Sequence, residues 1–111
     1  MKPNEQRRAL VLGLGASGVA AARLLRHHGW TVSVADEKAD PEWIGRLFSA
    51  DGPGVTVVDR VETLSAADID QVVVSPGIAH EHHWLRHVRA LGIPVIPEFE
   101  LGLVWMPGVR V

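Results

Sequence analysis

Short apolar runs, each closed by a glycine, a proline or a polar turn, alternate with longer amphipathic stretches along this chain. The runs at residues 9–12, 31–35, 55–58, 71–74 and 93–96 are short and rich in valine, which predicts buried strands. Apolar residues between them follow helical spacing, first up to Gly29, then over residues 42–49 and 81–91. The alternation predicts an α/β, Rossmann-like fold: a doubly wound sheet of about five mostly parallel strands with flanking helices.

The second predicted helix begins after Asp40 and Pro41, which suit a helix cap and a first helical position. Its apolar residues are expected to face the sheet; they are Trp43, Ile44, Leu47 and Phe48. The tryptophans at 30, 43, 84 and 105 are expected in the core rather than on a base-stacking surface. Residues 59–69 predict a polar connection with a helical turn at 65–68, and residues 98–105 predict a further helix or a linker.

A glycine motif follows the first strand. Gly13-Leu14-Gly15-Ala16-Ser17-Gly18 fits G-x-G-x-x-G at the passage from strand to helix. The first glycine permits a tight turn, the second lets a diphosphate approach the backbone, and the third lets the helix pack closely on the strand. The helix N-terminus then offers unpaired N–H groups to an anion. Asp36, at the end of the second strand, stands where a ribose hydroxyl or a base donor is commonly bound.

A second sharp turn follows the fourth strand, at Ser75-Pro76-Gly77-Ile78. Ligands of doubly wound sheets bind beyond the carboxyl ends of the strands. The glycine motif, Asp36 and this second turn all follow strands, so we expect them at one edge of the sheet. The sequence therefore predicts a binding site formed by three separate segments.

Composition and charge limit the partners and the cellular location that we expect. The chain has 111 residues, enough for one domain, and 11 Lys and Arg against 13 Asp and Glu give a net charge of −2. This balance argues against nucleic acid and anionic membranes as partners. Cysteine is absent and no signal peptide or membrane-length apolar run is seen, so we expect a cytoplasmic protein without disulfides.

The sequence gives less support to a metal site or a catalytic site. The histidines at 80, 82, 83 and 87 invite a metal site, but no acidic or cysteine ligand set completes such a site, so none is expected. Ser17 and Ser75 have no base assigned by spacing, and Glu98 and Glu100 would diverge on a helix. We therefore assign no catalytic residue.

Four segments together resemble a known family. These are GLGASG after the first strand, Asp36 after the second, SPGI after the fourth, and IPVIPEFELG near the end. The combination is similar to the N-terminal, UDP-binding domain of the Mur ligases, over about residues 8–106. The SPGI turn and the EFEL segment make it far more specific than the glycine motif alone.

The resemblance implies that this domain holds the UDP part of UDP-N-acetylmuramoyl-L-alanine. The implied UDP-binding residues are Gly13, Gly15, Ala16, Ser17, Gly18, Asp36, Glu37, Lys38, Ser75 and Gly77. Ala16 and Ser17 would present N–H groups to the diphosphate, and Gly77 would close on the nucleotide through its backbone. Family members often have Thr-Arg or a similar pair after the Asp; Glu37 and Lys38 depart from that pattern, and lysine lacks the planar stacking of arginine.

The resemblance also divides the chain. Residues 1–7 are expected to be a disordered lead-in, residues 8–106 the UDP-binding domain, and residues 107–111 the start of a central ATP-binding domain. ATP and Mg²⁺ would be bound by the rest of the protein, which would make a peptide bond in peptidoglycan precursor synthesis. This chain carries no ATP phosphate loop and no cofactor of its own, and alone it is expected to be inactive. Apolar residues in 99–111 lead us to expect weak self-association there.

Two alternatives stay open at this stage. The first is an NAD-binding Rossmann regulatory module, because a strand-end Asp36 suits a ribose diol as well as a uracil. The second is a small dehydrogenase, for which no catalytic lysine, tyrosine or histidine is placed by a motif. Binding of UDP against NAD separates these readings.

Overall fold

The computed structural model describes residues 7–51, 54–75, 78 and 82–97. Its centre is a five-stranded sheet in the order β3-β2-β1-β4-β5, and every strand pairing in it is parallel. The strands are β1 (Arg8–Leu12), β2 (Thr31–Ala35), β3 (Val55–Val57), β4 (Gln71–Val74) and β5 (Val95–Pro97). The predicted fold class is thereby confirmed.

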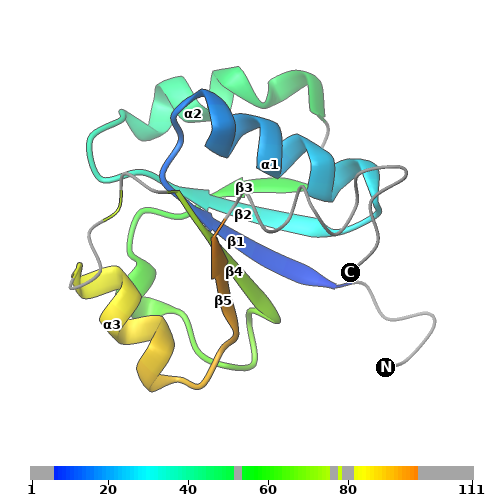
Figure 1. Ribbon diagram of the computed structural model, residues 1–111. Coiled ribbons are helices and arrows are strands. Elements are labelled where there is room, and N and C mark those ends of the chain that lie inside the picture. Colours follow the sequence, from blue (N-terminus) through cyan, green and yellow to red (C-terminus); the bar gives the residue numbers. More distant parts are fainter. Residues whose placement is uncertain (1–6, 52–53, 76–77, 79–81, 98–111) are drawn as a thin grey trace.

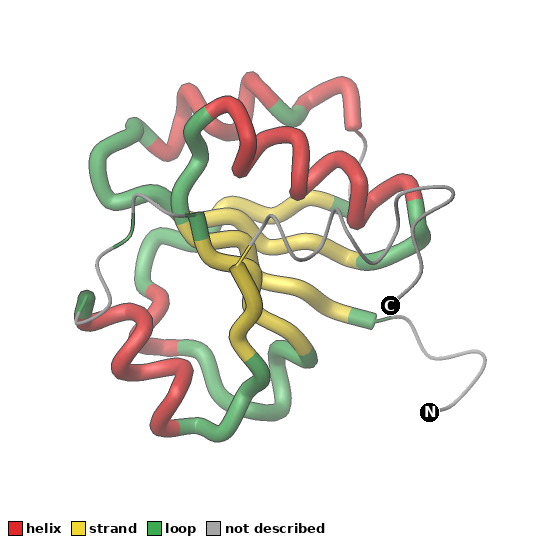
Figure 2. Tube along the Cα trace, in the orientation of Figure 1, coloured by secondary structure: helices red, strands yellow, loops and turns green. Residues whose placement is uncertain are grey.

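Helices cover both faces of the sheet (Figure 1). α1 (Ala16–His27) and α2 (Pro41–Leu47) lie on one face, and α3 (His83–Ala90) lies on the other. Two 3₁₀ turns complete the described elements, η1 (Ser49–Asp51) and η2 (Val61–Thr63). Because the strands are parallel, the loops that follow β1 and β2 emerge at the same edge of the sheet, as the tube in Figure 2 shows.

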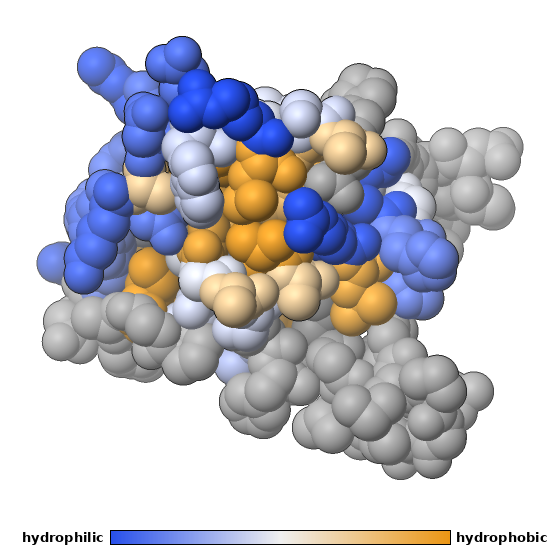
Figure 3. Space-filling view, turned by 90° about the horizontal axis from the view of Figure 1, so that it is seen from above, coloured by the Kyte–Doolittle hydropathy of each residue, from blue (hydrophilic) through white to orange (hydrophobic). Residues whose placement is uncertain are grey.

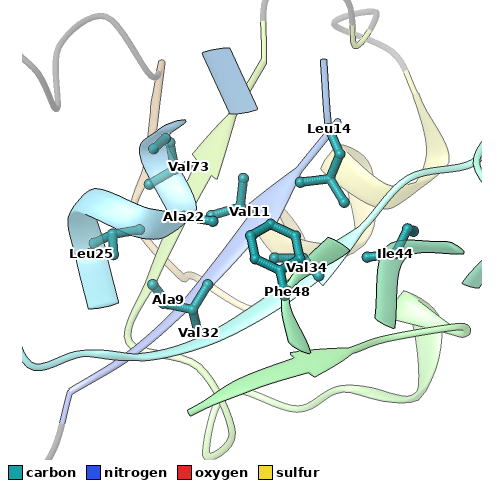
Figure 4. Packing of buried hydrophobic residues seen from close by; sticks show 11 residues of the cluster. Ala9, Val11, Leu14, Ala22, Leu25, Val32, Val34, Ile44, Phe48 and Val73 are labelled. Carbon is teal, nitrogen blue, oxygen red and sulfur yellow. The ribbon is translucent and has the colours of Figure 1, made fainter. Parts of the chain in front are cut away.

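β1 is buried on both sides, and its alternate residues feed two separate cores. Ala9 and Val11 belong to the core beneath α1 and α2, whereas Leu10 and Leu12 belong to the core beneath α3. Phe48, only 3% exposed, packs the end of the α2 segment against the core beneath α1 and α2 (the first core). Figure 4 shows Phe48 beside Val34. Burial of a side chain of this size contributes about 1.5–3 kcal/mol. The two cores fix the loops at the carboxyl edge relative to one another.

One core prediction is wrong. Trp43 is 45% exposed, although it was expected to face the sheet. Ile44 and Phe48 are four residues apart and share one buried face, so the side chain of Trp43 is turned about 100° away from Ile44 and about 140° away from Phe48. Trp84 is 6% exposed, as expected, and Trp30 packs partly buried against the first core. Seen from the side of α1 and α2, apolar atoms gather in the middle of the surface with hydrophilic atoms around them (Figure 3).

Two elements begin two residues later than predicted. The third helix begins at His83 rather than at residue 81, because the side chain of His82 accepts a hydrogen bond from the N–H of Trp84 and caps the helix. The fifth strand begins at Val95 rather than at residue 93, since Ile93 packs into the core beneath α3 before the ladder starts. The expected turn at 65–68 is present, with the Asp68 N–H donating to the Ser65 carbonyl at 3.0 Å.

Several expectations concern residues that the structure does not describe. These are the lead-in at 1–6, the segment at 98–105, the junction at 107–111, the self-association through 99–111, and the role of Gly77. Among the residues that are described, no helix has both the length and the apolar character needed to cross a membrane.

Candidate functional site

A pocket of about 270 Å³ opens at the carboxyl edge of the sheet, where the segments that follow β1, β2 and β4 meet the start of α3. Its described lining consists of Gly13, Leu14, Gly15, Asp36, Glu37, Lys38, Ser75, Ile78 and His82. The edge position is where ligands of doubly wound sheets bind. The three segments predicted to form one site do meet around one hollow.

Gly13 makes the turn that brings the first segment into the pocket. Its φ is +91°, a conformation that L side chains rarely adopt, and its N–H donates to the Ala35 carbonyl at 2.8 Å. A Cβ at this position would lie 2.7 Å from the Cβ of Ser75. Both the backbone conformation and the packing against the β4 turn therefore require glycine here.

Gly15 differs from Gly13 in both respects. It is the N-cap of α1 with a φ of −69°, and a Cβ built there meets no atom within 4 Å. Since Gly15 lines the pocket, that empty space is space a ligand can use. The cap makes no side-chain hydrogen bond within the described structure, which leaves the first-turn N–H groups of α1 for an anion.

The remaining residues of the glycine motif begin α1. Ala16 and Ser17 are exposed in the first turn of α1, and Gly18 is buried against the sheet. None of these three belongs to the described lining. Their contact with a diphosphate stays a prediction.

Asp36 joins the end of β2 to the glycine loop. One carboxylate oxygen accepts the N–H of Leu14 at 2.7 Å, and the other accepts the N–H groups of Lys38 at 2.9 Å and Ala39 at 3.0 Å. Partial burial, the strongest single influence, raises the pKa of Asp36. The three N–H donors and the charge of Lys38 together outweigh it and hold the pKa below its ordinary 3.8.

These bonds give Asp36 a role that sequence reasoning missed. The prediction was that its carboxylate binds the ligand, yet three of its roughly four acceptor positions are taken by the backbone of this chain. Asp36 thus holds the glycine loop and the β2–α2 loop together at the pocket. A signal existed in the sequence, because an aspartate at a strand end commonly binds backbone N–H groups two or three residues later.

We expect Asp36→Asn to lower the free energy of unfolding by about 1–3 kcal/mol. An asparagine side chain accepts hydrogen bonds only through its amide oxygen, so its NH₂ group cannot replace the second carboxylate oxygen of Asp36. A carboxylate whose pKa is lower when folded stabilises the fold above its unfolded pKa, and this stability is lost as the pH falls through the folded pKa. The unfolding free energy of the unchanged protein should therefore fall below pH 3.8, and that of the variant should fall less. Urea denaturation at pH 3 and pH 7 measures both; equal pH slopes would contradict the assignment.

Glu37, Lys38 and His82 also line the pocket. The Nε2 atom of His82 lies 3.0 Å from the Oε1 atom of Glu37, across 45 residues of sequence. The His82 side chain is 13% exposed and that of Glu37 is 50% exposed. This pair was not predicted, since nothing in the linear order of the sequence shows that the β2–α2 loop and the start of α3 meet.

The pair also changes the metal question. The sequence alone predicts no ligand set that completes a histidine site, but Glu37, His82 and His83 place one ligand atom each within 4.8 Å of one another. A metal ion on His82 Nε2 needs the proton on Nδ1, whereas Nδ1 accepts the N–H of Trp84 at 3.1 Å. The cap bond therefore favours a proton on Nε2, and the geometry describes a hydrogen-bonded pair better than a metal centre.

The structure thus brings together six predicted residues, namely Gly13, Gly15, Asp36, Glu37, Lys38 and Ser75. Leu14, Ile78 and His82 complete the described lining and were not predicted as site residues. Leu14 is 6% exposed, so it contributes mainly its backbone and an apolar floor. Gly77 lies outside the described residues.

Comparison with known families decides the relationship. Residues 7–97 match the model of the Mur ligase MurD-like N-terminal domain. The chain belongs to this MurD-like family. The relationship covers the glycine loop, Asp36 and the β4 turn, which are the segments that form the pocket.

Relatives of this MurD-like domain are named UDP-N-acetylmuramoylalanine–D-glutamate ligase. The protein of that name from a Synechococcus strain is 45% identical over 96 residues, which are 86% of this chain and 20% of the relative. The one from Koribacter versatilis is 36% identical over 103 residues, or 92% of this chain and 23% of the relative. The chain therefore spans about a fifth of the length of these curated relatives.

Solved structures show the same fold in other proteins. Shikimate dehydrogenase from Aquifex aeolicus superposes with a TM-score of 0.59 at 18% identity, over 89% of this chain and 45% of that one. UDP-D-ManNAc dehydrogenase from Pyrococcus horikoshii gives a TM-score of 0.55 at 19% identity, over 81% and 28%. At these identities the likeness concerns the Rossmann-like fold of the MurD-like domain and not its ligand.

Proposed function

We propose that this chain is the nucleotide-sugar-binding domain of a UDP-N-acetylmuramoylalanine–D-glutamate ligase and that its pocket holds the UDP moiety of the substrate. The observation that carries the proposal is the meeting of the glycine loop, the β2 end and the β4 turn around one pocket in a member of the MurD-like family. The name of these relatives supplies the substrate class.

The glycine-loop side of the pocket suits a diphosphate. Gly15 leaves the backbone bare, and the start of α1 presents N–H groups with the partial positive charge of a helix N-terminus. Lys38, in the pocket lining, adds a full positive charge. The nucleoside would then extend toward Asp36, Glu37 and His82, which carry hydrogen-bonding groups in the pocket lining.

The complete reaction requires parts of the protein beyond this chain. The substrate carboxylate would be activated by ATP and Mg²⁺ as an acyl phosphate, and the amine of D-glutamate would then displace phosphate. The printed sequence contains no G-x-x-x-x-G-K-[ST] loop, so ATP and Mg²⁺ would be bound by the central domain. We expect the present chain to bind substrate and to leave the peptide-bond chemistry to the remaining domains.

We expect the isolated chain to bind UDP measurably and NAD much more weakly. The pocket of about 270 Å³ is of a size for part of a nucleotide, and the relatives of this chain are named as ligases of a UDP-linked substrate. Isothermal titration calorimetry with UDP, UDP-N-acetylmuramoyl-L-alanine and NAD measures the three affinities. A preference for NAD over both uridine ligands would replace this proposal with an NAD-binding module.

A further inference from the structure

The start of α3 is capped by a histidine. His82 is the N-cap of α3, and its Nδ1 atom accepts the N–H of Trp84 at 3.1 Å. The common caps are serine, threonine, aspartate and asparagine, whose side-chain oxygens remain acceptors throughout the neutral pH range. An imidazole nitrogen differs from them, because it loses its lone pair when the ring takes up a proton. The cap of α3 is therefore a kind of group whose charge ordinarily changes between pH 5 and pH 8.

The other ring nitrogen of His82 has a partner of the opposite kind. Nε2 lies 3.0 Å from Oε1 of Glu37, and the His82 side chain is 13% exposed. In the neutral ring, the lone pair on Nδ1 leaves the proton on Nε2, which donates to Glu37. In the charged ring both nitrogens carry protons, so the bond to Glu37 becomes charge-assisted and the bond from the Trp84 N–H is lost. Protonation therefore keeps one partner of the ring and releases the other.

Two further histidines of α3 lack this property. Nε2 of His83 lies 3.1 Å from Oε2 of Glu62, and Nε2 of His87 lies 3.0 Å from the Leu64 carbonyl oxygen. Both partners are acceptors, so each of these rings can donate whether it is neutral or charged. Among the hydrogen bonds described for α3, the bond from Trp84 to His82 is the one that protonation of a histidine breaks.

The charges around His82 determine where the protonated ring is held. The titratable and charged groups that line the same pocket, pair with its neighbour or follow it on α3 are Asp36, Glu37, Lys38, Glu62, His83, Arg86 and His87. Glu37 attracts the charged ring, whereas the positive end of the α3 dipole repels it. The stacked ring of His83, with its centroid 4.6 Å away, repels it as well when both rings are charged. The charged ring is thus drawn toward Glu37 and away from the helix end.

We propose that His82 is a pH-sensitive helix cap. When neutral, it caps α3 and donates to Glu37; when protonated, it keeps Glu37 and releases the Trp84 N–H, which loosens the first turn of α3. Because His82 lines the pocket, acid alters the pocket wall at the start of this helix. The inference goes beyond the proposed function, since it concerns the chain without a ligand.

Two NMR measurements on the free chain test the cap, each made at pH 8 and pH 5.5. The lower pH protonates an ordinary imidazole and stays above the range in which carboxylates ordinarily titrate. Ring ¹⁵N shifts should show a single proton on Nε2 of His82 at pH 8 and a charged ring at pH 5.5. The exchange protection factor of the Trp84 amide, corrected for intrinsic exchange, should fall about fivefold or more at pH 5.5, as for the loss of one cap. A proton on Nδ1 at pH 8, a ring that stays neutral at pH 5.5, or equal protection at both pH values would overturn the inference.

A pair of matched variants assigns the effect to one ring. Asparagine is among the best N-cap residues and does not titrate, so in His82→Asn the protection of the Trp84 amide should be the same at both pH values. His83→Asn removes the stacked neighbour and leaves the cap, so the fall at pH 5.5 should remain. A fall of unchanged size in His82→Asn, or its loss in His83→Asn, would overturn the inference because a different group would then control the helix start.

Discussion

Replacing Gly13 with alanine is expected to lower the free energy of unfolding by about 2–6 kcal/mol, a large part of the stability of a small domain. The estimate combines about 1–3 kcal/mol for a side chain at a φ of +91° with about 1–3 kcal/mol for overpacking. The overpacking arises because the new Cβ would lie 2.7 Å from the Cβ of Ser75 and 3.2 Å from Cγ1 of Ile78. Urea denaturation measures the loss.

Gly29 provides the matched control for that experiment. Its φ is +87°, close to that of Gly13, but a Cβ there meets no atom within 4 Å. Gly29→Ala should therefore carry only the conformational part, about 1–3 kcal/mol. The difference between the two variants isolates the contact between the glycine loop and the β4 turn. Equal losses would show that the two segments are not packed as described.

The second large effect concerns ligand binding rather than stability. Gly15→Val is expected to weaken UDP binding at least a hundredfold, because the branched side chain would fill space next to bare backbone that the diphosphate needs. The fold should survive, since the backbone conformation at Gly15 suits any residue and the space is open in the free protein. We expect a stability loss of roughly 1 kcal/mol from the poorer N-cap. Calorimetry and thermal denaturation measure the two effects.

Gly45 serves as the control for Gly15. A Cβ at Gly45 likewise meets no atom within 4 Å, and this residue is exposed in α2, away from the described pocket lining. Gly45→Val should therefore leave UDP affinity unchanged. Normal UDP binding by Gly15→Val would contradict the account, because the glycine loop would then be a packing turn only.

The fold and the glycine loop were predictable because their causes are local. Valine-rich runs closed by turn residues predict buried strands, and all five runs form strands in the sheet. Gly13 permits the backbone turn, and Gly15 leaves the backbone uncovered by a side chain. The strand–glycine–helix pattern predicts both roles. The parallel alternation of elements then places the ends of β1, β2 and β4 together without further information.

The parts that were missed depend on contacts between distant segments. Glu37 and His82 are 45 residues apart, and only the packing of α3 on the sheet shows that they meet. Asp36 binds backbone N–H groups of its own chain, and this depends on the direction in which the Leu14 N–H points. Trp43 was expected in the core from its apolar character, but its rotation around α2 relative to Ile44 leaves it exposed. Each miss reflects geometry that single-residue properties do not contain.

The most direct test of the central claim is a map of backbone amide shifts in the ¹⁵N-labelled chain as UDP is added. The account predicts progressive shifts concentrated at residues 13–18, 36–38 and 75–78, with a further response at His82 and Trp84 through the Glu37 pair. Shifts spread over other surfaces, or a response to NAD at these positions with none to UDP, would contradict the assignment of this pocket to a UDP moiety.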